Sequence, residues 1–329
     1  MAVLATLGLA CLAATSITLA QAHRGVALTP RNFPSHTMAD VDDAFRQARE
    51  LGRHVVFIYQ WGQVDPKVVK LMLDKAAQSR LVAILGVSPT TLDQGRKELD
   101  LPASLRAKAN GNLSFSNPAI RSEYLKLVVQ LGRFKPPYLC LATEINLLGI
   151  QRLEEFLHFV TLYKQAYHAV KKVSPATSVF VSFQWEWVRI LDAREPRRVA
   201  DHAKLINIFN PELDLVGLTT YPSQFHENPA RLPHDYYRWI FRHVPSLTPV
   251  MIMEAGWPTS GSGSEAEQVA FVERLPGLLK GINLVGLEWA LLHDVQIGSF
   301  DANLNTVGLR YRDGRPKPAY ERFRGLNLR

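Results

Sequence analysis

The 329-residue sequence predicts an α/β fold, a single (β/α)8 TIM barrel, and three observations support this prediction. Eight short apolar runs follow one another along the chain, most of them are separated by segments with helical periodicity, and several end in a polar or aromatic residue. Apolar strands that alternate with amphipathic helices indicate a parallel sheet covered on both faces, and eight such units can close into a barrel. A doubly wound open sheet is the alternative, but no glycine-rich phosphate loop follows the first strand.

Each predicted strand is an apolar run bounded by glycine, proline or polar residues. We find no repeat other than the strand–helix alternation and no long linker in residues 23–329, so we expect one domain. The expected strands are residues 25–30, 54–59, 81–87, 137–144, 177–183, 213–218, 250–254 and 284–290.

Helices are expected where apolar residues recur at a spacing of three to four. Pro66 stands at a usual first-turn position, Asn117-Pro118 starts another helix, and Ser264-Glu265-Ala266-Glu267 fits a capping box. Residues 88–118 are polar, and we interpret them as a long connection over one end of the fold. The expected helices are residues 38–52, 66–78, 118–132, 153–173, 201–209, 234–243 and a helix that starts after residue 264, and residues 311–324 close the domain.

The N-terminal segment, residues 1–22, is apolar, and the first charged residue of the chain is Arg24. Ala20-Gln21-Ala22 has the small-x-small pattern of a cleavage site, so we expect a signal peptide and a secreted or periplasmic protein. The segment lacks the usual positive charge at its start. An uncleaved N-terminal anchor is the alternative, because the run is close to membrane-spanning length.

Cysteine count and charge narrow the range of partners. Cys140 is the only cysteine outside the leader, so no internal disulfide can form, and we interpret it as a small core residue. The formal net charge is +8, with Lys and Arg scattered along the chain. The densest cluster, Arg194, Arg197 and Arg198, is short and lacks interleaved aromatic residues, so nucleic-acid binding has little support. Acidic polymers or an anionic cell surface remain as candidate partners, and we expect a monomer.

Two of the predicted strands end in glutamate. The seventh strand ends in Glu254, and alternation puts Ile252 and Glu254 on one face; the fourth has the same form and ends in Glu144. A charge at the rim of a core is costly unless it is paired or used. Reactive residues of such barrels sit where strands end and loops begin. We therefore expect Glu144 and Glu254 to face each other across the barrel mouth and to act as paired carboxyl groups.

Aromatic residues also concentrate just after the strands. Five of the six tryptophans fall at this predicted rim. Flat rings with polar edges around a cleft suit the C–H faces and hydroxyls of sugars, which predicts a carbohydrate substrate. Rings that only close the top of the barrel are the alternative. The rim residues are Trp61, Trp185, Trp187, Tyr221, Trp257 and Trp289.

On these residues the sequence resembles the retaining glycosidases of glycoside hydrolase clan A. The run from Glu254 to Pro258 is similar to the nucleophile motif of arabinogalactan endo-β-1,4-galactanases and endo-β-1,3-glucanases, and residues 313–320 are similar to the end of many such domains. The resemblance implies that Glu144 is the acid/base and Glu254 the nucleophile. It also implies that Tyr221 hydrogen-bonds the nucleophile and that Trp289 is a substrate platform. The implied reaction is hydrolysis of the O-glycosidic bonds of a polysaccharide or glycoside by double displacement.

One residue departs from the pattern of that clan. The clan usually has asparagine directly before the acid/base glutamate, where it binds the sugar 2-hydroxyl, and here the position holds Thr143. A threonine hydroxyl can hydrogen-bond but reaches less far. The expected substrate contacts include Thr143 and Asn146. Because the 2-hydroxyl contact strengthens in the transition state, two alternatives stay open, a non-catalytic carbohydrate-binding barrel and a glucan-remodelling transglycosylase.

Other charged residues beside strand ends are interpreted as structural. Glu186 lies between Trp185 and Trp187, so it points opposite to both, and Glu288 precedes Trp289 in the same way. If the tryptophans face the cleft, both glutamates face the helices. No His, Asp or Glu spacing resembles a metal site, and no Ser or Cys stands in a nucleophile motif, so we expect no cofactor and no metal.

Overall fold

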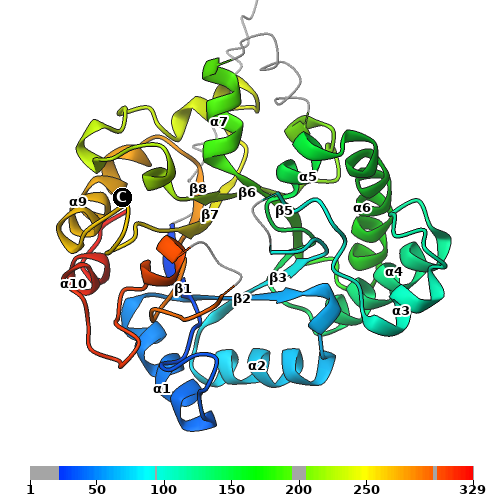
Figure 1. The fold of residues 1–329 in the computed structure, drawn as a ribbon, viewed down its shortest axis with the longest axis horizontal. Helices are drawn as coiled ribbons and strands as arrows, with labels where there is room; N and C mark the ends of the chain where they lie inside the picture. Colours follow the sequence, from blue (N-terminus) through cyan, green and yellow to red (C-terminus); the bar gives the residue numbers. More distant parts are fainter. Residues whose placement is uncertain (1–21, 93–94, 195–204, 299–301, 329) are drawn as a thin grey trace, which may run out of the picture.

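The computed structural model describes residues 22–92, 95–194, 205–298 and 302–328. These residues form a closed barrel of parallel strands in the order β1 to β8, which confirms the predicted fold class. Figure 1 shows the strands at the centre of the molecule and the helices around them. The expected leader up to residue 21, together with Arg197 and Arg198, lies outside the described residues, so these interpretations stay predictions.

Neighbouring strands pair in parallel all the way around, from Gly25 opposite His54 to Ala255 opposite Trp289. β4 is short and ends at Cys140, so Glu144 lies in the loop after the strand rather than at its last position. The strands are β1 (His23–Ala27), β2 (His54–Gln60), β3 (Val82–Ser88), β4 (Tyr138–Cys140), β5 (Ser178–Gln184), β6 (Val216–Thr220), β7 (Val250–Ala255) and β8 (Leu284–Trp289).

Four of the longer helices begin where a short polar side chain accepts from a free backbone amide. Thr37 forms a capping box at α1, and Asp65, Asn117 and Ser264 cap α2, α4 and α9. The helices are α1 (Met38–Leu51), α2 (Pro66–Gln78), α3 (Ala103–Lys108), α4 (Pro118–Arg133), α5 (Ile145–Gln151), α6 (Leu153–Val173), α7 (Trp185–Arg194), α9 (Glu265–Leu278) and α10 (Pro318–Arg324).

The predicted elements differ from the structure mainly between strands. Residues 234–243 do not form the expected α-helix, because they fold as a turn followed by the 3₁₀ helix Arg238–Arg242. Of the expected helix 201–209, residues 201–204 lie outside the described residues and residues 205–207 are helical. The connection 88–118 contains the short helix α3, and α5 was not expected. Irregular and very short helices lack the periodicity that predicts longer ones.

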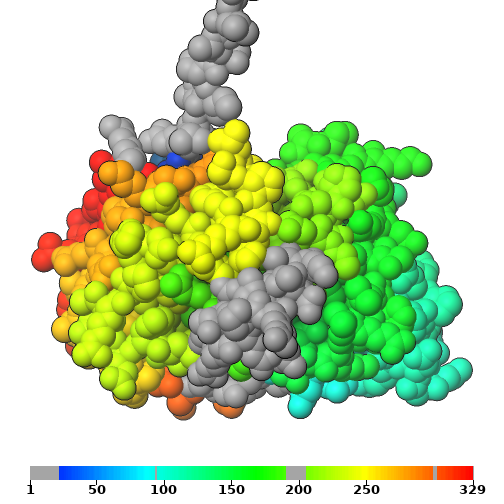
Figure 2. All heavy atoms as spheres, turned by 90° about the horizontal axis from the view of Figure 1, so that it is seen from above, coloured from blue at the N-terminus to red at the C-terminus, as the bar shows by residue number. Residues whose placement is uncertain are grey.

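Two apolar layers stabilise the barrel. The larger layer lies between the strands and the surrounding helices, and a smaller cluster that includes Val56, Ile84, Cys140, Phe180 and Met251 fills the barrel interior. Figure 2 shows a side of the molecule on which the segment between β6 and β7, coloured yellow-green to yellow, covers much of the visible surface. A membrane-spanning helix would need a long apolar stretch, and the described part of the chain contains no such helix.

Candidate active site

The two predicted glutamates lie at the same end of the barrel. Glu254 belongs to β7, and Glu144 follows β4 and stands at the N-terminus of α5. Thr219 connects them, because its hydroxyl donates to Glu144 Oε1 at 2.7 Å while its Cα pairs with that of Glu254 on the neighbouring strand. Both glutamates keep partial exposure. The structure therefore brings together the two carboxyl groups that the sequence indicated.

An irregularity in β7 turns Glu254 toward the mouth. Ile252 packs outward beneath the helices, and Met253 lies inside the barrel, so strict alternation would point Glu254 outward again. The register with β6 shifts here: Leu218 pairs with Ile252, but the next residue, Thr219, pairs with Glu254. Met253 is thus an extra residue, a β-bulge that re-aims the following side chain. The expectation that Ile252 and Glu254 share a face is wrong for this reason.

Tyr221 holds Glu254 in place. Its hydroxyl donates to Glu254 Oε2 at 2.5 Å, which is the contact that the family resemblance implies. Tyr221 follows β6 and is 8% exposed. Gly256 provides space for the ring, because a Cβ at this position would lie 2.8 Å from a ring carbon of Tyr221. The glycine after the glutamate is therefore explained by close packing of tyrosine.

Arg96 completes the site, and sequence analysis did not identify it. Its Nε donates to Glu144 Oε2 at 2.6 Å and its Nη1 donates to Ser88 Oγ at 2.8 Å. Arg96 is only 8% exposed. It comes from the polar connection after β3, where no periodicity indicates what a side chain contacts. The only sequence feature that could have pointed to Arg96 is its place in residues 88–118, which were expected to cross one end of the fold.

The electrostatics of the site couple its acidic groups. Burial and the nearby charge of Glu144 raise the pKa of Glu254 to about 7, while the Tyr221 hydrogen bond and the charge of Arg96 reduce the rise. Burial, followed by the charge of Glu254, raises the pKa of Tyr221, so the phenol keeps the proton that it donates. The two carboxyl groups are therefore close enough for the charge of Glu144 to act on Glu254. Acid and nucleophile chemistry requires such a pair, with one member protonated and the other ionised.

The tryptophans after β7 and β8 do not face the mouth. Trp257 and Trp289 have 0% exposure. Both pack against Phe271 of α9, and Trp289 also contacts Phe323 of α10. They lie between the barrel and its helices, so neither presents a face to a sugar, and the predicted platform role of Trp289 is wrong in this structure.

The other rim tryptophans are mostly buried as well. Trp61 is 3% exposed and packs edge-on against Tyr124 of α4. Trp185 has 0% exposure and lies among the rings that follow β6, with Trp239 as one neighbour. Trp187 alone among the predicted rim tryptophans keeps partial exposure. Sugar stacking is therefore open to Trp187, whereas Trp61 and Trp185 act as core residues.

The two residues expected to replace the clan's asparagine are also buried. Asn146 has 0% exposure, and its amide both donates to the Gln184 carbonyl at 3.1 Å and accepts from the Gln184 amide at 2.8 Å. It joins α5 to the end of β5 and is fully buried there. Thr143 has 0% exposure, and its hydroxyl has no hydrogen-bond partner among the described residues. Neither residue reaches a substrate in this structure.

Solved structures of glycoside hydrolases contain the same barrel. GH5_18 from Streptomyces cattleya, in complex with GlcNAc, matches with a TM-score of 0.70 and 18% identity, over 93% of this chain and 80% of that chain. The exo-β-1,4-mannosidase Op5Man5 from Opitutaceae bacterium strain TAV5 matches with a TM-score of 0.71 and 16% identity, over 92% and 58%. A family 39 glycoside hydrolase from Bacteroides cellulosilyticus WH2 matches with a TM-score of 0.59 and 14% identity, over 92% and 62%. The chain has the fold of these glycoside hydrolases.

Sequence comparison adds no relative to this structural likeness. No protein-family model matches the sequence, and no curated protein matches it. The shared feature is the barrel, and the resemblance of the Glu254 motif to that of galactanases and β-1,3-glucanases stays a prediction.

Glu186 is a buried residue that supports Tyr221 in the site. It is 1% exposed and accepts from the Tyr221 backbone amide at 3.0 Å and from the Tyr236 hydroxyl at 2.9 Å. Thr220 donates its hydroxyl to the same carboxyl group at 2.5 Å. Burial raises the pKa of Glu186, and these donors reduce the rise. The interpretation of Glu186 as structural is confirmed, because it fixes the backbone of Tyr221.

Glu288 faces the inside of the barrel, which corrects the prediction that it faces the helices. Its Oε1 lies 2.6 Å from His54 Nδ1, and the two side chains are at most 1% exposed. Gly25 and Gly286 create the space, because a Cβ would lie 2.1 and 2.4 Å, respectively, from the Glu288 carboxylate oxygens. Alternation explains the error: Trp289 faces the helices, so Glu288 must face inward.

Lys317, in the segment 313–320 near the end of the chain, joins the loops after β7 and β8. The Lys317 ammonium is fully buried and donates to Asp294 at 2.7 Å and to the Thr259 hydroxyl at 2.8 Å. It also donates to the Thr306 carbonyl at 2.8 Å. One lysine thus ties together three loop segments near the mouth.

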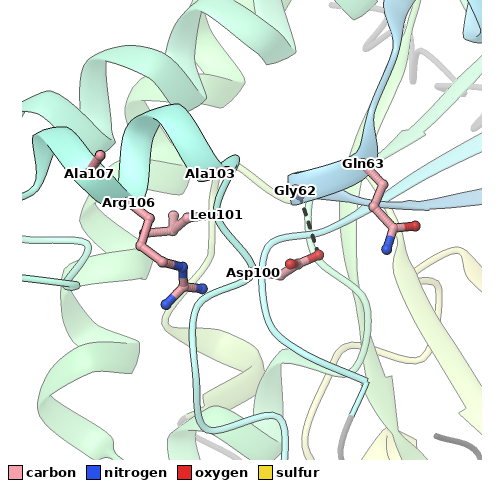
Figure 3. Close-up of a pocket in the computed structure, with 7 residues that line it drawn as sticks. All are labelled: Gly62, Gln63, Asp100, Leu101, Ala103, Arg106 and Ala107. Carbon is pink, nitrogen blue, oxygen red and sulfur yellow. Dashed lines mark hydrogen bonds between the residues drawn. The ribbon is translucent and has the colours of Figure 1, made fainter.

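A cavity of about 560 Å³ lies between the loop after β2 and α3. In Figure 3, Asp100 lies below Gly62, with Arg106 on one side and Gln63 on the other, and Asp100 accepts from the Gly62 amide at 3.3 Å. Burial raises the pKa of Asp100. The cavity is lined by Gly62, Gln63, Asp100, Leu101, Ala103, Arg106 and Ala107 and so includes neither of the paired glutamates.

Proposed function

We propose that the protein is a retaining β-glycosidase that hydrolyses O-glycosidic bonds of a polysaccharide or glycoside. The observation that carries this proposal is the pair Glu144 and Glu254, held at the mouth by Thr219 and Tyr221. Solved structures with the same fold are glycoside hydrolases, and one of them is a mannosidase, which supports the same class of chemistry. The resemblance of Glu144 and Glu254 to the acid/base and nucleophile of glycoside hydrolase clan A supports double displacement.

The proposed mechanism assigns one role to each carboxyl group. Glu144 gives its proton to the glycosidic oxygen while a Glu254 oxygen attacks the anomeric carbon, so the sugar becomes an ester of Glu254 and the leaving alcohol departs. Glu144, now ionised, takes a proton from water, and the water oxygen displaces Glu254. Tyr221 orients the attacking carboxylate and Thr219 orients the acid/base.

Two alternatives use the same mouth. A non-catalytic carbohydrate-binding barrel is favoured by Thr143, whose buried hydroxyl leaves the position of the clan's asparagine without a group for the sugar 2-hydroxyl. A transglycosylase would use the same glutamates and replace water by a sugar hydroxyl as acceptor.

A substrate panel of β-glucans, galactans and mannans tests the proposal, with E144Q and E254Q as variants. We expect wild-type turnover on at least one substrate and a loss of at least about 100-fold in each variant. Azide with an E254G variant should yield the α-glycosyl azide, and azide with E144G the β-glycosyl azide. Binding without turnover, unchanged in both glutamine variants, would support the non-catalytic barrel, and products longer than the substrate would support the transglycosylase.

We also propose export to the periplasm or the medium, supported by the apolar segment 1–22 with its Ala20-Gln21-Ala22 pattern. N-terminal sequencing of the protein from its native host is expected to begin at His23. A chain that starts at Met1 and sediments with membranes would instead support an uncleaved anchor.

A further inference from the structure

The connection after β3 folds back on itself above the paired glutamates. Thr90 and Leu99 form an antiparallel bridge, and the Thr91 amide donates to the Glu98 carbonyl at 2.9 Å. The Asp100 amide donates to the Pro89 carbonyl at 2.9 Å and closes the base of this hairpin. Side chains from outside the hairpin add to these contacts, because the Arg152 guanidinium donates to the Lys97 carbonyl at 2.9 Å and Arg106 donates to the Leu99 carbonyl at 3.2 Å.

The second half of the hairpin places one guanidinium directly on the acid/base candidate. Arg96 Nε lies 2.6 Å from Glu144 Oε2. Both residues have left-handed backbone conformations, with φ of 44° at Arg96 and 52° at Glu144, which are uncommon away from glycine. Such conformations persist where the surrounding structure imposes them, often at functional sites. The Arg96 charge also reaches the other half of the pair, because it reduces the rise in the pKa of Glu254 that burial and Glu144 cause.

The ion pair conflicts with the first step of the proposed reaction. A general acid must carry a proton when the glycosidic bond breaks, whereas a carboxyl group that accepts from arginine at this distance is ionised. Glu254 is the group that must be ionised to attack, yet burial raises its pKa to about 7, which favours its protonated form. If Arg96 moves off Glu144, that carboxyl group is free to carry the proton that a general acid needs.

A neutral sugar has no group that replaces the carboxylate partner of a buried arginine. Leaving a buried charge unpaired is costly, so Arg96 needs an anionic group in exchange for Glu144. A planar carboxylate matches the guanidinium fork, and Glu144 already shows such a group bound there. The formal net charge of +8 would attract an acidic polysaccharide toward the protein.

We propose that the substrate is a glycoside of a uronic acid, and that Arg96 binds its carboxylate and thereby releases Glu144 to act as the acid. This inference rests on the proposed glycosidase function and deepens it by naming the substrate class. Arg96 is then both a substrate-binding residue and a switch that couples recognition of the acidic sugar to protonation of the catalytic pair.

The test compares aryl glycosides that differ only at C6: 4-nitrophenyl β-D-glucuronide with the glucoside, and the β-D-galacturonide with the galactoside. The variants are R96Q and R96K, with K97Q as control, because Lys97 is an exposed cation on the same hairpin. We expect wild type and K97Q to prefer one uronide by at least 100-fold in kcat/KM. In R96Q the uronide rate should fall by at least 100-fold, mainly through KM, and the preference for the uronide over the matched neutral glycoside should be lost.

Equal rates on the paired glycosides in wild type, or an equal loss on both in R96Q, would overturn the inference. A binding experiment separates it from the proposed function. Glucuronate and glucose oligosaccharides are titrated into E254Q and E254Q/R96Q by calorimetry. Uronate binding that needs Arg96, without any turnover in wild type, would support uronate recognition by Arg96 but overturn both the glycosidase proposal and the release of Glu144 as acid. Turnover of neutral glycosides without any uronate binding would support the glycosidase proposal and overturn this inference.

Discussion

Thr219 donates its hydroxyl to Glu144 at 2.7 Å from a backbone position opposite Glu254 on the next strand. The side chain that orients one carboxyl group is therefore built into the strand pair that carries the other. Movement of β6 against β7 would change both positions together, so this threonine links the geometry of the two halves of the site.

Replacing Thr219 by valine removes the hydroxyl and keeps the shape of the side chain. A hydrogen bond to a charged group contributes about 1.5–3 kcal/mol, so we expect kcat to fall by about 10- to 100-fold. KM should change little, because Thr219 contacts Glu144 rather than the sugar. The measurement is steady-state kinetics on the best substrate of the panel, with T219S as the control that restores the donor. Unchanged kcat in T219V would remove Thr219 from the positioning role.

The meeting of Glu144 and Glu254 could be predicted from sequence because parallel strands must end at the same edge of a barrel. The direction in which the neighbouring side chains point could not be predicted. Both faces of a strand in a parallel barrel are apolar, so the run that ends in Trp289 gives no sign of which residues face inward. The bulge at Met253 adds a second difficulty, because one extra residue reverses the faces and leaves no mark in the local sequence.

Arg96 shows the other limit of sequence analysis. Its partner Glu144 is 48 residues away, and the hairpin that presents it is short and polar. Hydrophobic periodicity predicts packed helices and strands, whereas a charged loop residue is placed by tertiary contacts alone. The residue that decides how the site can work was for this reason absent from the predicted list, while four buried tryptophans were present in it.

Gly256→Ala should disturb the site through Tyr221. The new Cβ would lie 2.8 Å from the tyrosine ring, so the ring must shift away from Glu254. Overpacking of this kind costs about 1–3 kcal/mol of stability, and the displaced hydroxyl should lower kcat by at least about 10-fold. Thermal unfolding and kinetics measure the two effects. Gly277→Ala is the matched control, because nothing lies within 4 Å of its added Cβ, and it should unfold at the same or a higher temperature.

The raised pKa of Glu254 predicts a pH-dependent stability. The unfolded chain releases this proton near the ordinary pKa of 4.5, and the folded chain keeps it up to about 7. Stability from this group is therefore complete below pH 4.5 and is lost as the pH rises to 7. E254Q lacks this titration. The free energy of unfolding of E254Q minus that of wild type should therefore rise by on the order of 2 kcal/mol between pH 5 and pH 8. Urea unfolding at several pH values measures this.

The control for that experiment is E123Q, which removes an exposed glutamate from α4. Its stability difference from wild type should not vary with pH over the same range. A constant difference for E254Q as well would show that Glu254 has an ordinary pKa and that the site does not couple its two carboxyl groups.

The His54–Glu288 pair inside the barrel predicts a strongly non-additive double-mutant cycle. Burial raises the pKa of Glu288, His54 counteracts the rise, and Glu288 Oε2 has no hydrogen-bond partner among the described residues. Removing His54 alone, as in H54L, leaves this carboxyl group buried without its partner, which should cost about 3–5 kcal/mol. H54L/E288M replaces both groups by apolar ones and should be at least about 1 kcal/mol more stable than H54L. Urea unfolding of wild type, both single variants and the double variant measures the coupling, and simple addition of the two single losses would mean that the pair is not coupled in the folded barrel.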